Sequence, residues 1–389
     1  MLLENNPYPR DVRVRAEAEA LVRAGYAVEV VAPRRRGERR RETVNGVEVR
    51  RFRGIDGGRH GAAGYLAEYL IAATALHLAA VRALIGGSSY LHLHNPPDIL
   101  FAAAALYRLA GRVVIFDHHD LAPETIEAKL GTGPFVRLAR ICERLTFACA
   151  THVLSTNRSY AEIAIRRGGK SEAQVTVVRN GPPAAWTDVP MQMRAGALEH
   201  VRLAYVGTLS SQDGVEGLAP VLAGLRALEP PIDAALEIIG DGAARPALEA
   251  EFARHGVADR VTFSGWVALE RVPELVAQAD ICVDPAPAFE VNQRSTMIKL
   301  AEYLALGKPV VAYDLLESRR TVAGAGELVP PGDVDGFTGA IARIARDPDL
   351  RSRLAGEARQ RAGELTWEHS EQALIAAYAA LARHRRGRP

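Results

Sequence analysis

The chain has 389 residues and a formal net charge of +2, with 48% hydrophobic and 24% charged residues. This balance is ordinary for a soluble globular protein and argues against a polycationic nucleic-acid-binding protein. At this length we expect about two α/β domains of roughly 150–200 residues each. The three cysteines, Cys142, Cys149 and Cys282, lie in apolar stretches without the spacing of zinc ligands. We therefore expect buried free thiols, a reducing compartment and, with no signal peptide evident, a cytoplasmic protein.

Strands and helices alternate along the first half of the chain. A helical pattern at 16–24 precedes a strand at 27–31, and further strands are predicted at 91–94, 112–116, 152–155 and 175–178. Helices are predicted at 100–110 and from residue 159. Only Met1, Leu2 and Leu3 precede the first loop, whereas an ordinary strand has about five residues. Two interpretations stay open, a very short first strand or a chain that begins further upstream.

The second half repeats the alternation, with strands predicted at 202–206, 235–239, 261–263, 281–283 and 310–312. Such units give parallel sheets covered by helices on both faces. The predicted fold class is therefore α/β, with two Rossmann-like, doubly wound parallel-sheet domains that face each other across a cleft. We place the domains at residues 1–182 and 183–365, and expect residues 366–389 to form a helix that packs back toward the N-terminal domain. Ligands of such sheets bind beyond the carboxyl ends of the strands.

Two segments bear on contact with a membrane. The most apolar window, residues 62–84, contains Glu68, His77 and Arg82, so we expect a helix that packs in the core or lies on a surface, not one that spans a bilayer. Arginines at 34–36, 39–41, 50, 51 and 53 form a dense basic segment near a turn. An anionic membrane face would attract this segment, and a solvated loop is the alternative interpretation.

The most distinctive segment is residues 292–309, in which Ser295 or Thr296 is a natural N-cap and Gly307 ends a helix. Helical spacing places Ser295, Lys299 and Glu302 on one stripe. A diphosphate at this N-terminus would meet free N–H groups, the positive end of the helix dipole, a hydroxyl and an ammonium group. Glu302 would accept hydrogen bonds from ribose hydroxyls. The alternative is a capped core helix with a solvent-exposed Lys–Glu pair.

Two glycine-containing loops follow strands of the second half, Gly207-Thr208 and Gly240-Asp241. Small residues at such positions let a ligand approach the backbone closely. Neither loop matches the glycine pattern of a dinucleotide-binding or Walker motif, and each is weak evidence by itself. We predict that both loops contribute to binding of a nucleotide donor.

In the first half, residues 116–124 follow a predicted buried strand and contain Asp117, His118, His119 and Asp120. Imidazole and carboxylate groups at a strand end can bind sugar hydroxyls or transfer protons. A metal site is less favoured, because adjacent side chains cannot all face one ion. We predict that His119 and Asp120 are catalytic.

With these motifs in place, the chain resembles glycosyltransferase family 4, which has the GT-B fold. The resemblance covers nearly the whole length and depends on the order and spacing of several modest motifs. They lie at residues 9–15, 94–98, 117–124, 206–208, 212–215, 239–242 and, most strongly, 295–314. Similar-looking members build bacterial surface polysaccharides, often from a polyprenyl-diphosphate-linked sugar.

The resemblance implies a retaining transfer from a nucleoside-diphosphate sugar, UDP-linked in our prediction, to a glycan or polyprenyl-linked acceptor. It implies that no metal or other cofactor takes part. The C-terminal domain would hold the donor and the N-terminal domain the acceptor, in a cytoplasmic protein at the inner membrane face.

The resemblance also assigns roles to single residues. Glu302 matches the glutamate that binds the ribose, and Ser295 and Thr296 match positions near the diphosphate. His119 matches the histidine close to the transferred sugar, and we group Lys299 with it as catalytic. The residues expected on the acceptor side are Arg13, His94 and Asn95.

Three positions depart from the family pattern. Arg294 stands where many members have a second glutamate that contacts the donor sugar, and Thr208 and Asp213 stand where many have an Arg and a Lys. Lys299, Arg294 and Arg13 could supply the missing positive charge beside the diphosphate. Two alternatives therefore stay open, a non-catalytic protein that binds a glycan or a partner, and a nucleotide-sugar epimerase of the same fold.

Overall fold

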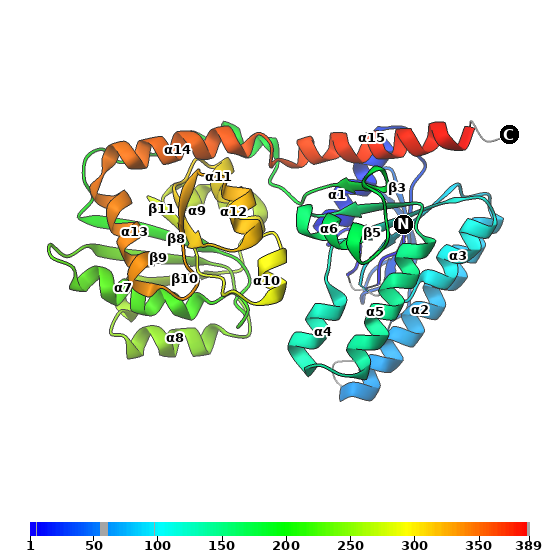
Figure 1. Ribbon diagram of the computed structural model, residues 1–389, viewed down its shortest axis with the longest axis horizontal. Helices are drawn as coiled ribbons and strands as arrows, with labels where there is room; N and C mark the ends of the chain where they lie inside the picture. The colour runs from blue at the N-terminus through cyan, green and yellow to red at the C-terminus, as the bar shows by residue number, and fades with distance from the viewer. Residues whose placement is uncertain (5, 55–60, 97, 387–389) are drawn as a thin grey trace. The chain divides into compact units, whose positions relative to one another are not determined.

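The computed structural model describes residues 1–4, 6–54, 61–96 and 98–386. Pro97, within the 94–98 motif, and residues 387–389 of the predicted C-terminal helix lie outside these ranges. Contacts divide the chain into two compact units (Figure 1): unit 1 comprises residues 1–179 and those from 370 onward, and unit 2 comprises residues 180–369. The boundaries expected from the sequence, at 182 and 365, lie within a few residues of these.

Unit 1 is built on parallel strands. They are β1 (Glu29–Pro33), β2 (Arg41–Val44), β3 (Val47–Phe52), β4 (Tyr90–His94), β5 (Val113–His118), β6 (His152–Ser155) and β7 (Val175–Val177). Neighbours β4 to β7 are parallel, β1 is parallel to β3, and β2 is antiparallel to β3. Leu2 bridges the two groups by pairing with Val31 of β1 and Leu93 of β4. Residues 1–3 thus contribute one bridging residue and no strand of ordinary length. Strands β2 and β3 were not among the strands predicted from the sequence.

The helices of unit 1 are α1 (Val12–Arg23), α2 (Gly61–Ile85), α3 (Phe101–Leu109), α4 (Ala122–Leu130), α5 (Pro134–Cys149), α6 (Arg158–Arg166) and most of α15 (Trp367–Arg386). The segment Ala67–Ile85 is long and apolar enough to cross a membrane by length and composition, and 22% of it is buried. Its residues Leu76 and Ala80 pack into the core with Ala104 of α3 and Phe147 of α5. This part of α2 therefore covers the unit with one face only.

Unit 2 contains six parallel strands in the order β10-β9-β8-β11-β12-β13. They are β8 (His200–Val206), β9 (Asp233–Ile239), β10 (Val261–Gly265), β11 (Ile281–Asp284), β12 (Val310–Tyr313) and β13 (Gly326–Val329). Since all six run in the same direction, their carboxyl ends lie along one edge of the sheet. The loops after β8, β9 and β11 therefore come close to one another.

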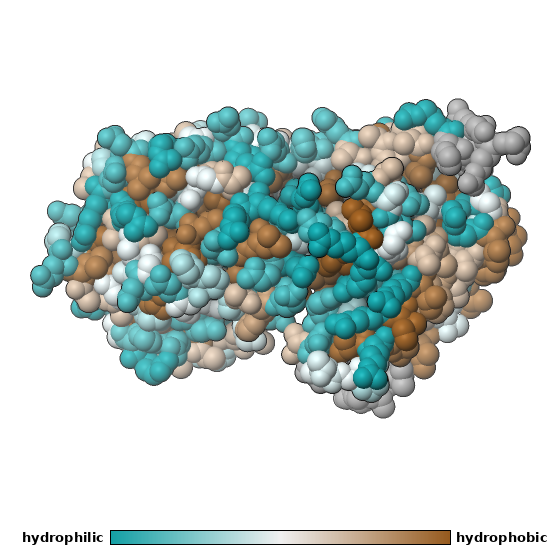
Figure 2. All heavy atoms as spheres, viewed as in Figure 1, coloured by the Kyte–Doolittle hydropathy of each residue, from teal (hydrophilic) through white to brown (hydrophobic). Residues whose placement is uncertain are grey.

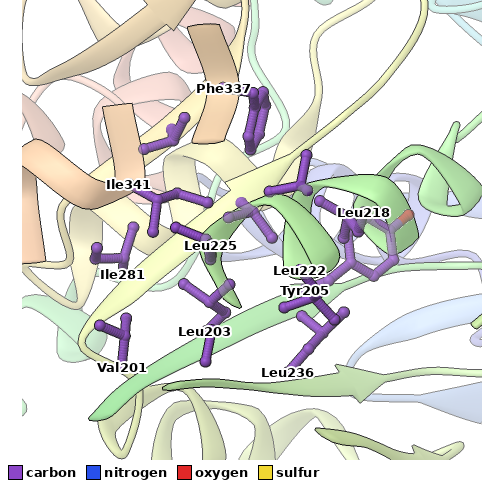
Figure 3. Close-up of a cluster of buried hydrophobic side chains, with 14 of the residues drawn as sticks. Val201, Leu203, Tyr205, Leu218, Leu222, Leu225, Leu236, Ile281, Phe337 and Ile341 are labelled. Carbon is purple, nitrogen blue, oxygen red and sulfur yellow. The ribbon is translucent and has the colours of Figure 1, made fainter. Parts of the chain in front are cut away.

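The helices of unit 2 are α7 (Leu218–Ala227), α8 (Arg245–Arg254), α9 (Val272–Ala277), α10 (Glu290–Arg294), α11 (Ile298–Ala305), α12 (Leu316–Val322), α13 (Val334–Arg346) and α14 (Pro348–Ala362). Figure 3 shows Leu203 and Tyr205 of β8 against Leu222 of α7 and Ile341 of α13. Ala204, between the two β8 residues, belongs to a second cluster with α11 and α14. Both faces of the sheet are thus covered, which confirms the predicted α/β class.

The cysteines differ in part from the expectation. All three are free, but only Cys282 is buried, whereas Cys142 and Cys149 of α5 are half-buried. Helix α5 lies on the outside of unit 1, so its apolar residues do not all point inward.

Candidate functional site

Helix α11 begins later than the sequence suggested. Its N-cap is Met297, which provides no side-chain hydrogen bond, so the predicted cap at Ser295 or Thr296 is wrong. Ser295 instead follows α10, where its N–H donates to the carbonyl of Val291 at 2.9 Å. The backbone is extended at Ser295 and Met297, which separates two short helices. Ser295 therefore does not share a helical stripe with Lys299 and Glu302.

The C-terminal end of α11 is as predicted. Gly307 adopts a left-handed conformation with φ of 64°. The N–H of Lys308 then donates to the carbonyl of Tyr303 at 3.0 Å, which closes the helix.

Lys299 lies in the first turn of α11 and is buried among the loops of the sheet edge. Its Nζ donates to the hydroxyl of Tyr205 at 3.0 Å and lies 3.3 Å from Asp213 and 3.5 Å from Asp284. Burial alone would lower the pKa of Lys299, but Asp284, Tyr205 and Asp213 raise it. The ammonium group is therefore charged and already paired, and the expectation that it simply replaces a missing charge must be corrected.

The loops after β8 and β9 touch through their backbones. A Cβ at Gly240 would lie 1.9 Å from the carbonyl oxygen of Gly207, so no larger residue fits there. A Cβ at Gly207 would lie 3.1 Å from the Cε of Lys299. The predicted residues Gly207, Gly240 and Lys299 thus meet at the carboxyl ends of the strands, where ligands of such sheets bind.

Glu302 follows Lys299 by one helical turn and is half-buried. Within the described part of the chain, no hydrogen bond or ion pair reaches its carboxyl group. Burial raises the pKa of Glu302 to about 7, although the nearby Lys299 opposes this shift. A half-buried carboxylate without a hydrogen-bond donor costs free energy. A ligand hydroxyl could supply the missing donor.

The remaining residues predicted for the donor side lie at the rim of this edge. Thr208 is exposed. Asp241 accepts a hydrogen bond from the N–H of Gly242 at 2.8 Å and lies 3.4 Å from Arg245, so its side chain stabilises its own loop. Arg294 pairs with Glu290 at 2.7 Å and is therefore not a free cation. Ser295 and Thr296 are half-buried between α10 and α11.

In unit 1, Asp117 lies near the end of β5 at the centre of a buried cluster. Arg13 of α1 donates to both of its oxygens, at 2.8 and 2.6 Å, and a third guanidinium hydrogen bond reaches the carbonyl of Val178 at 2.9 Å. Burial would raise the pKa of Asp117, but Arg13 and His119 hold it well below its usual value. Asp117 is therefore a carboxylate, and Arg13 is its counter-ion.

Two predicted histidines contact this carboxylate. Nδ1 of His94 lies 2.9 Å from Asp117, and Nδ1 of His119 lies 3.3 Å from the same oxygen. Burial alone would lower the pKa of His119, but the charge of Asp117 raises it. Nε2 of His119 makes no hydrogen bond within the described chain, and the side chain is 12% exposed. This ring nitrogen is the one that can reach a substrate.

Asn95 holds the loop that carries His119 and Asp120. Its side-chain oxygen accepts from the N–H groups of His119 and Asp120 at 2.8 and 3.1 Å, and its amide donates to the carbonyl of Asp120 at 2.8 Å. Asn95 is buried, so its predicted contact with an acceptor gives way to a structural role. The Asp120 side chain is exposed.

A second layer of the cluster consists of residues that were not predicted from the sequence. Glu17 lies one turn after Arg13, 3.0 Å from its guanidinium, and His92 stacks on His94. Nδ1 of His92 lies 2.8 Å from the hydroxyl of Tyr378 in α15. The spacing of Arg13 and Glu17 on one helix face was the only sequence clue to this layer.

The same cluster could hold a cation by geometry. One ligand atom from each of Glu17, His92, His94 and Asp117 lies within 4.8 Å of the others. Arg13, however, contacts both carboxyl groups, and its guanidinium already supplies the positive charge that they require. The residues therefore fit a metal ion poorly.

Solved structures define the class of protein to which this fold belongs. A sucrose-phosphate synthase from Thermosynechococcus elongatus has a TM-score of 0.71 and 19% identity, over 96% of this chain and 93% of that chain. Alr3699/HepE from Anabaena, solved in complex with UDP-glucose, has a TM-score of 0.69 and 17% identity, over 97% and 98% of the two chains. At such identities the likeness concerns the fold, which is GT-B.

Family models and curated relatives identify the family. Residues 11–181 match the model "Glycosyl transferase 4-like domain" and residues 200–347 match "Glycosyl transferases group 1". An alpha-D-kanosaminyltransferase from Streptomyces kanamyceticus is 29% identical over 170 residues, 43% of this chain and 42% of the relative. The chain belongs to glycosyltransferase family 4. It spans about half the length of the curated relatives that it matches.

Proposed function

We propose that this protein transfers a sugar from a nucleoside-diphosphate sugar, with retention of anomeric configuration, to a glycan or lipid-linked acceptor. One observation carries the proposal: at the sheet edge of unit 2, the glycine backbones of 207 and 240 meet the charged Lys299, one turn from the unpartnered Glu302. Backbone, ammonium and carboxyl groups suit a diphosphate and a ribose. The complex of HepE with UDP-glucose supports a UDP-linked donor.

The chemistry assigns a separate task to each group. Glycosyl transfer passes through an oxocarbenium-like transition state while negative charge grows on the departing diphosphate. The ammonium of Lys299 and the first N–H groups of α11, which have no partner in the helix, can stabilise this charge without a metal ion. A donor phosphate oxygen can take the acceptor proton, so that no dedicated protein base is required.

Unit 1 supplies the acceptor side in this proposal. Asp117 fixes the orientation of His119 and favours a proton on its Nδ1, which directs Nε2 outward. The exposed carboxyl group of Asp120 can accept hydrogen bonds from sugar hydroxyls. We place the reaction in the cytoplasm, at the inner face of the membrane, in the synthesis of a surface polysaccharide or a related glycoconjugate.

One feature favours a second function, a non-catalytic protein that binds a glycan or a partner. Asp213 stands where many family members carry a lysine, and here it lies 3.3 Å from Lys299. The charge that should face a diphosphate is thereby partly compensated. A protein that no longer binds a nucleotide-sugar donor would tolerate this loss of positive charge.

A binding and turnover experiment separates the two functions. The purified protein is titrated with UDP, GDP and ADP by calorimetry and then incubated with a panel of nucleotide sugars, with slow donor hydrolysis and epimerised donor followed by NMR. The proposal predicts binding of one nucleoside diphosphate and release of the sugar with its original anomeric configuration. Absence of binding to all three would favour the non-catalytic function, and epimerised donor without transfer would favour an epimerase.

A further inference from the structure

Helices α2, α3 and α5 cover one side of unit 1 and expose an unusual amount of apolar surface. Most of the large apolar side chains that are exposed in the described chain lie on these three helices. The most prominent, each more than half exposed, are Leu70, Leu78, Ile85, Leu109, Phe135, Leu138 and Ile141. Helix α3 packs against both α2 and α5, so the exposed residues belong to one side of the unit. We call it the α2/α3/α5 face.

Helical spacing lets each helix bury one face in the core of unit 1 and expose apolar residues on the opposite face. On α5, Phe135, Leu138, Ile141 and Leu145 recur every three or four residues and point outward, whereas Phe147 belongs to the buried core. The outward stripe of α2 likewise lies opposite the residues that it buries. Because the buried faces hold the fold together, these helices can lie on a bilayer but cannot cross it without unfolding unit 1.

The exposed charges that α5 contributes to this face are positive. Helix α5 exposes Arg137, Arg140 and Arg144, and its single acidic residue, Glu143, is buried against Arg167. Arg140 pairs with Glu127 of α4, whereas Arg137 and Arg144 have no partner within the described residues. Figure 2 shows hydrophobic atoms gathered on the α2 and α5 side of this unit, with hydrophilic atoms beside them.

The basic segment identified in the sequence is a weaker candidate for membrane contact. Arg51 is buried and contacts Glu38 and Glu42, and Arg50 pairs with Glu29 at 2.7 Å. These two arginines therefore contribute little free charge. No comparable group of exposed apolar residues accompanies them in the described part of residues 29–54.

We propose that the α2/α3/α5 face docks on an anionic phospholipid surface. Its leucine, isoleucine and phenylalanine side chains enter the interface, and Arg137 and Arg144 extend to the lipid phosphates. A group of exposed apolar side chains on one side of a protein is typical of a binding site, and the arginines beside it favour a negatively charged partner. This proposal rests on the proposed transfer to a lipid-linked acceptor, and it names the surface that would bring the enzyme to that acceptor.

Vesicle flotation tests the proposal with two pairs of charge variants. Wild-type protein should float with vesicles that contain phosphatidylglycerol and not with pure phosphatidylcholine. Since each basic residue near the surface contributes about fivefold to partitioning, Arg137→Gln with Arg144→Gln should weaken binding roughly 25-fold. The matched control is Arg35→Gln with Arg36→Gln, two exposed arginines of the basic segment, which should change binding much less.

Apolar variants and two further measurements complete the test. Leu138→Glu with Ile141→Glu should abolish flotation, whereas Met193→Glu, an exposed residue of unit 2, should not. Binding that depends on Arg35 and Arg36 instead, equal binding to both lipids, or a wild-type dimer in gel filtration that Leu138→Glu disrupts would each overturn the proposal. Calorimetry with UDP on the same proteins keeps a failure of docking distinct from a failure of the proposed function.

Discussion

Replacing Glu302 with glutamine should make the empty protein more stable and its complex with UDP weaker. Burial raises the pKa of this carboxyl group from 4.5 to about 7, and the charge of Lys299 offsets only part of that rise. The unfolded chain ionises near 4.5, whereas the folded protein keeps the proton until about pH 7. Above pH 7 the folded state therefore holds an unfavourable carboxylate, and below 4.5 the penalty vanishes.

The size of the effect follows from the two pKa values. A pKa difference of about 2.5, at 1.36 kcal/mol for each pH unit, corresponds to at most about 3.4 kcal/mol of lost stability at pH 8. Glu302→Gln removes this penalty, so the melting temperature should rise by several degrees at pH 8 and by little at pH 4.5. Differential scanning calorimetry at both pH values measures the change in melting temperature. UDP affinity at pH 8 should fall roughly tenfold, because a charged acceptor is replaced by a neutral one.

The matched control is Glu357→Gln, a surface glutamate paired with Arg353, which should change little at either pH. A Glu302→Gln protein that is no more stable than wild type at pH 8 would refute the argument. So would an equal gain at pH 4.5, since a gain independent of pH could not come from the carboxylate.

Three further substitutions test the two clusters. Lys299→Ala should lower turnover about a hundredfold, because one fixed donor to the departing diphosphate is lost, and unchanged kcat in a folded variant would contradict this role. Asp213→Asn should tighten UDP binding about fivefold by releasing Lys299 from one carboxylate, whereas weaker binding in calorimetry would mean that Asp213 orients the ammonium. Asp117→Asn should cost about 3–5 kcal/mol in urea unfolding, since the buried Arg13 loses the carboxylate that accepts two of its hydrogen bonds and keeps only Glu17 as an acidic contact, and a cost below about 1 kcal/mol would argue against that pair.

Much of the fold could be predicted because it follows from local patterns in the sequence. The apolar strands of both halves are separated by amphipathic helices, and parallel neighbours follow from that alternation. Strands β2 and β3 were missed because their arginines look like a solvated loop. In the structure, Arg51 is buried between Glu38 and Glu42, so the charge that obscured the strand is paired.

The sites were predictable in position but not in chemistry. Glycines and polar residues at strand ends pointed to Gly207 and His119, which follow β8 and β5, and helical spacing pointed to Lys299, which lies in α11 beside Gly207. The partners of these residues come from distant parts of the chain: Asp117 is held by Arg13, 104 residues away. Local spacing does not contain such pairs, and it also could not show that extended backbone at Ser295 and Met297 would keep Ser295 out of α11.

Tyr378 of α15 completes unit 1 from the far end of the chain. Its ring contacts Tyr26 and Tyr90 at centroid distances of 5.3 and 5.4 Å, and its hydroxyl contacts His92. On the ribosome, roughly 200 residues separate the synthesis of Arg179 from that of Tyr378, or about 10–40 s. During that interval the first-made half of the protein has an uncovered aromatic surface, whereas unit 2, which is continuous in sequence, can fold as it emerges. Unit 2 is translated after residues 1–179, but it should therefore complete its fold before unit 1 does.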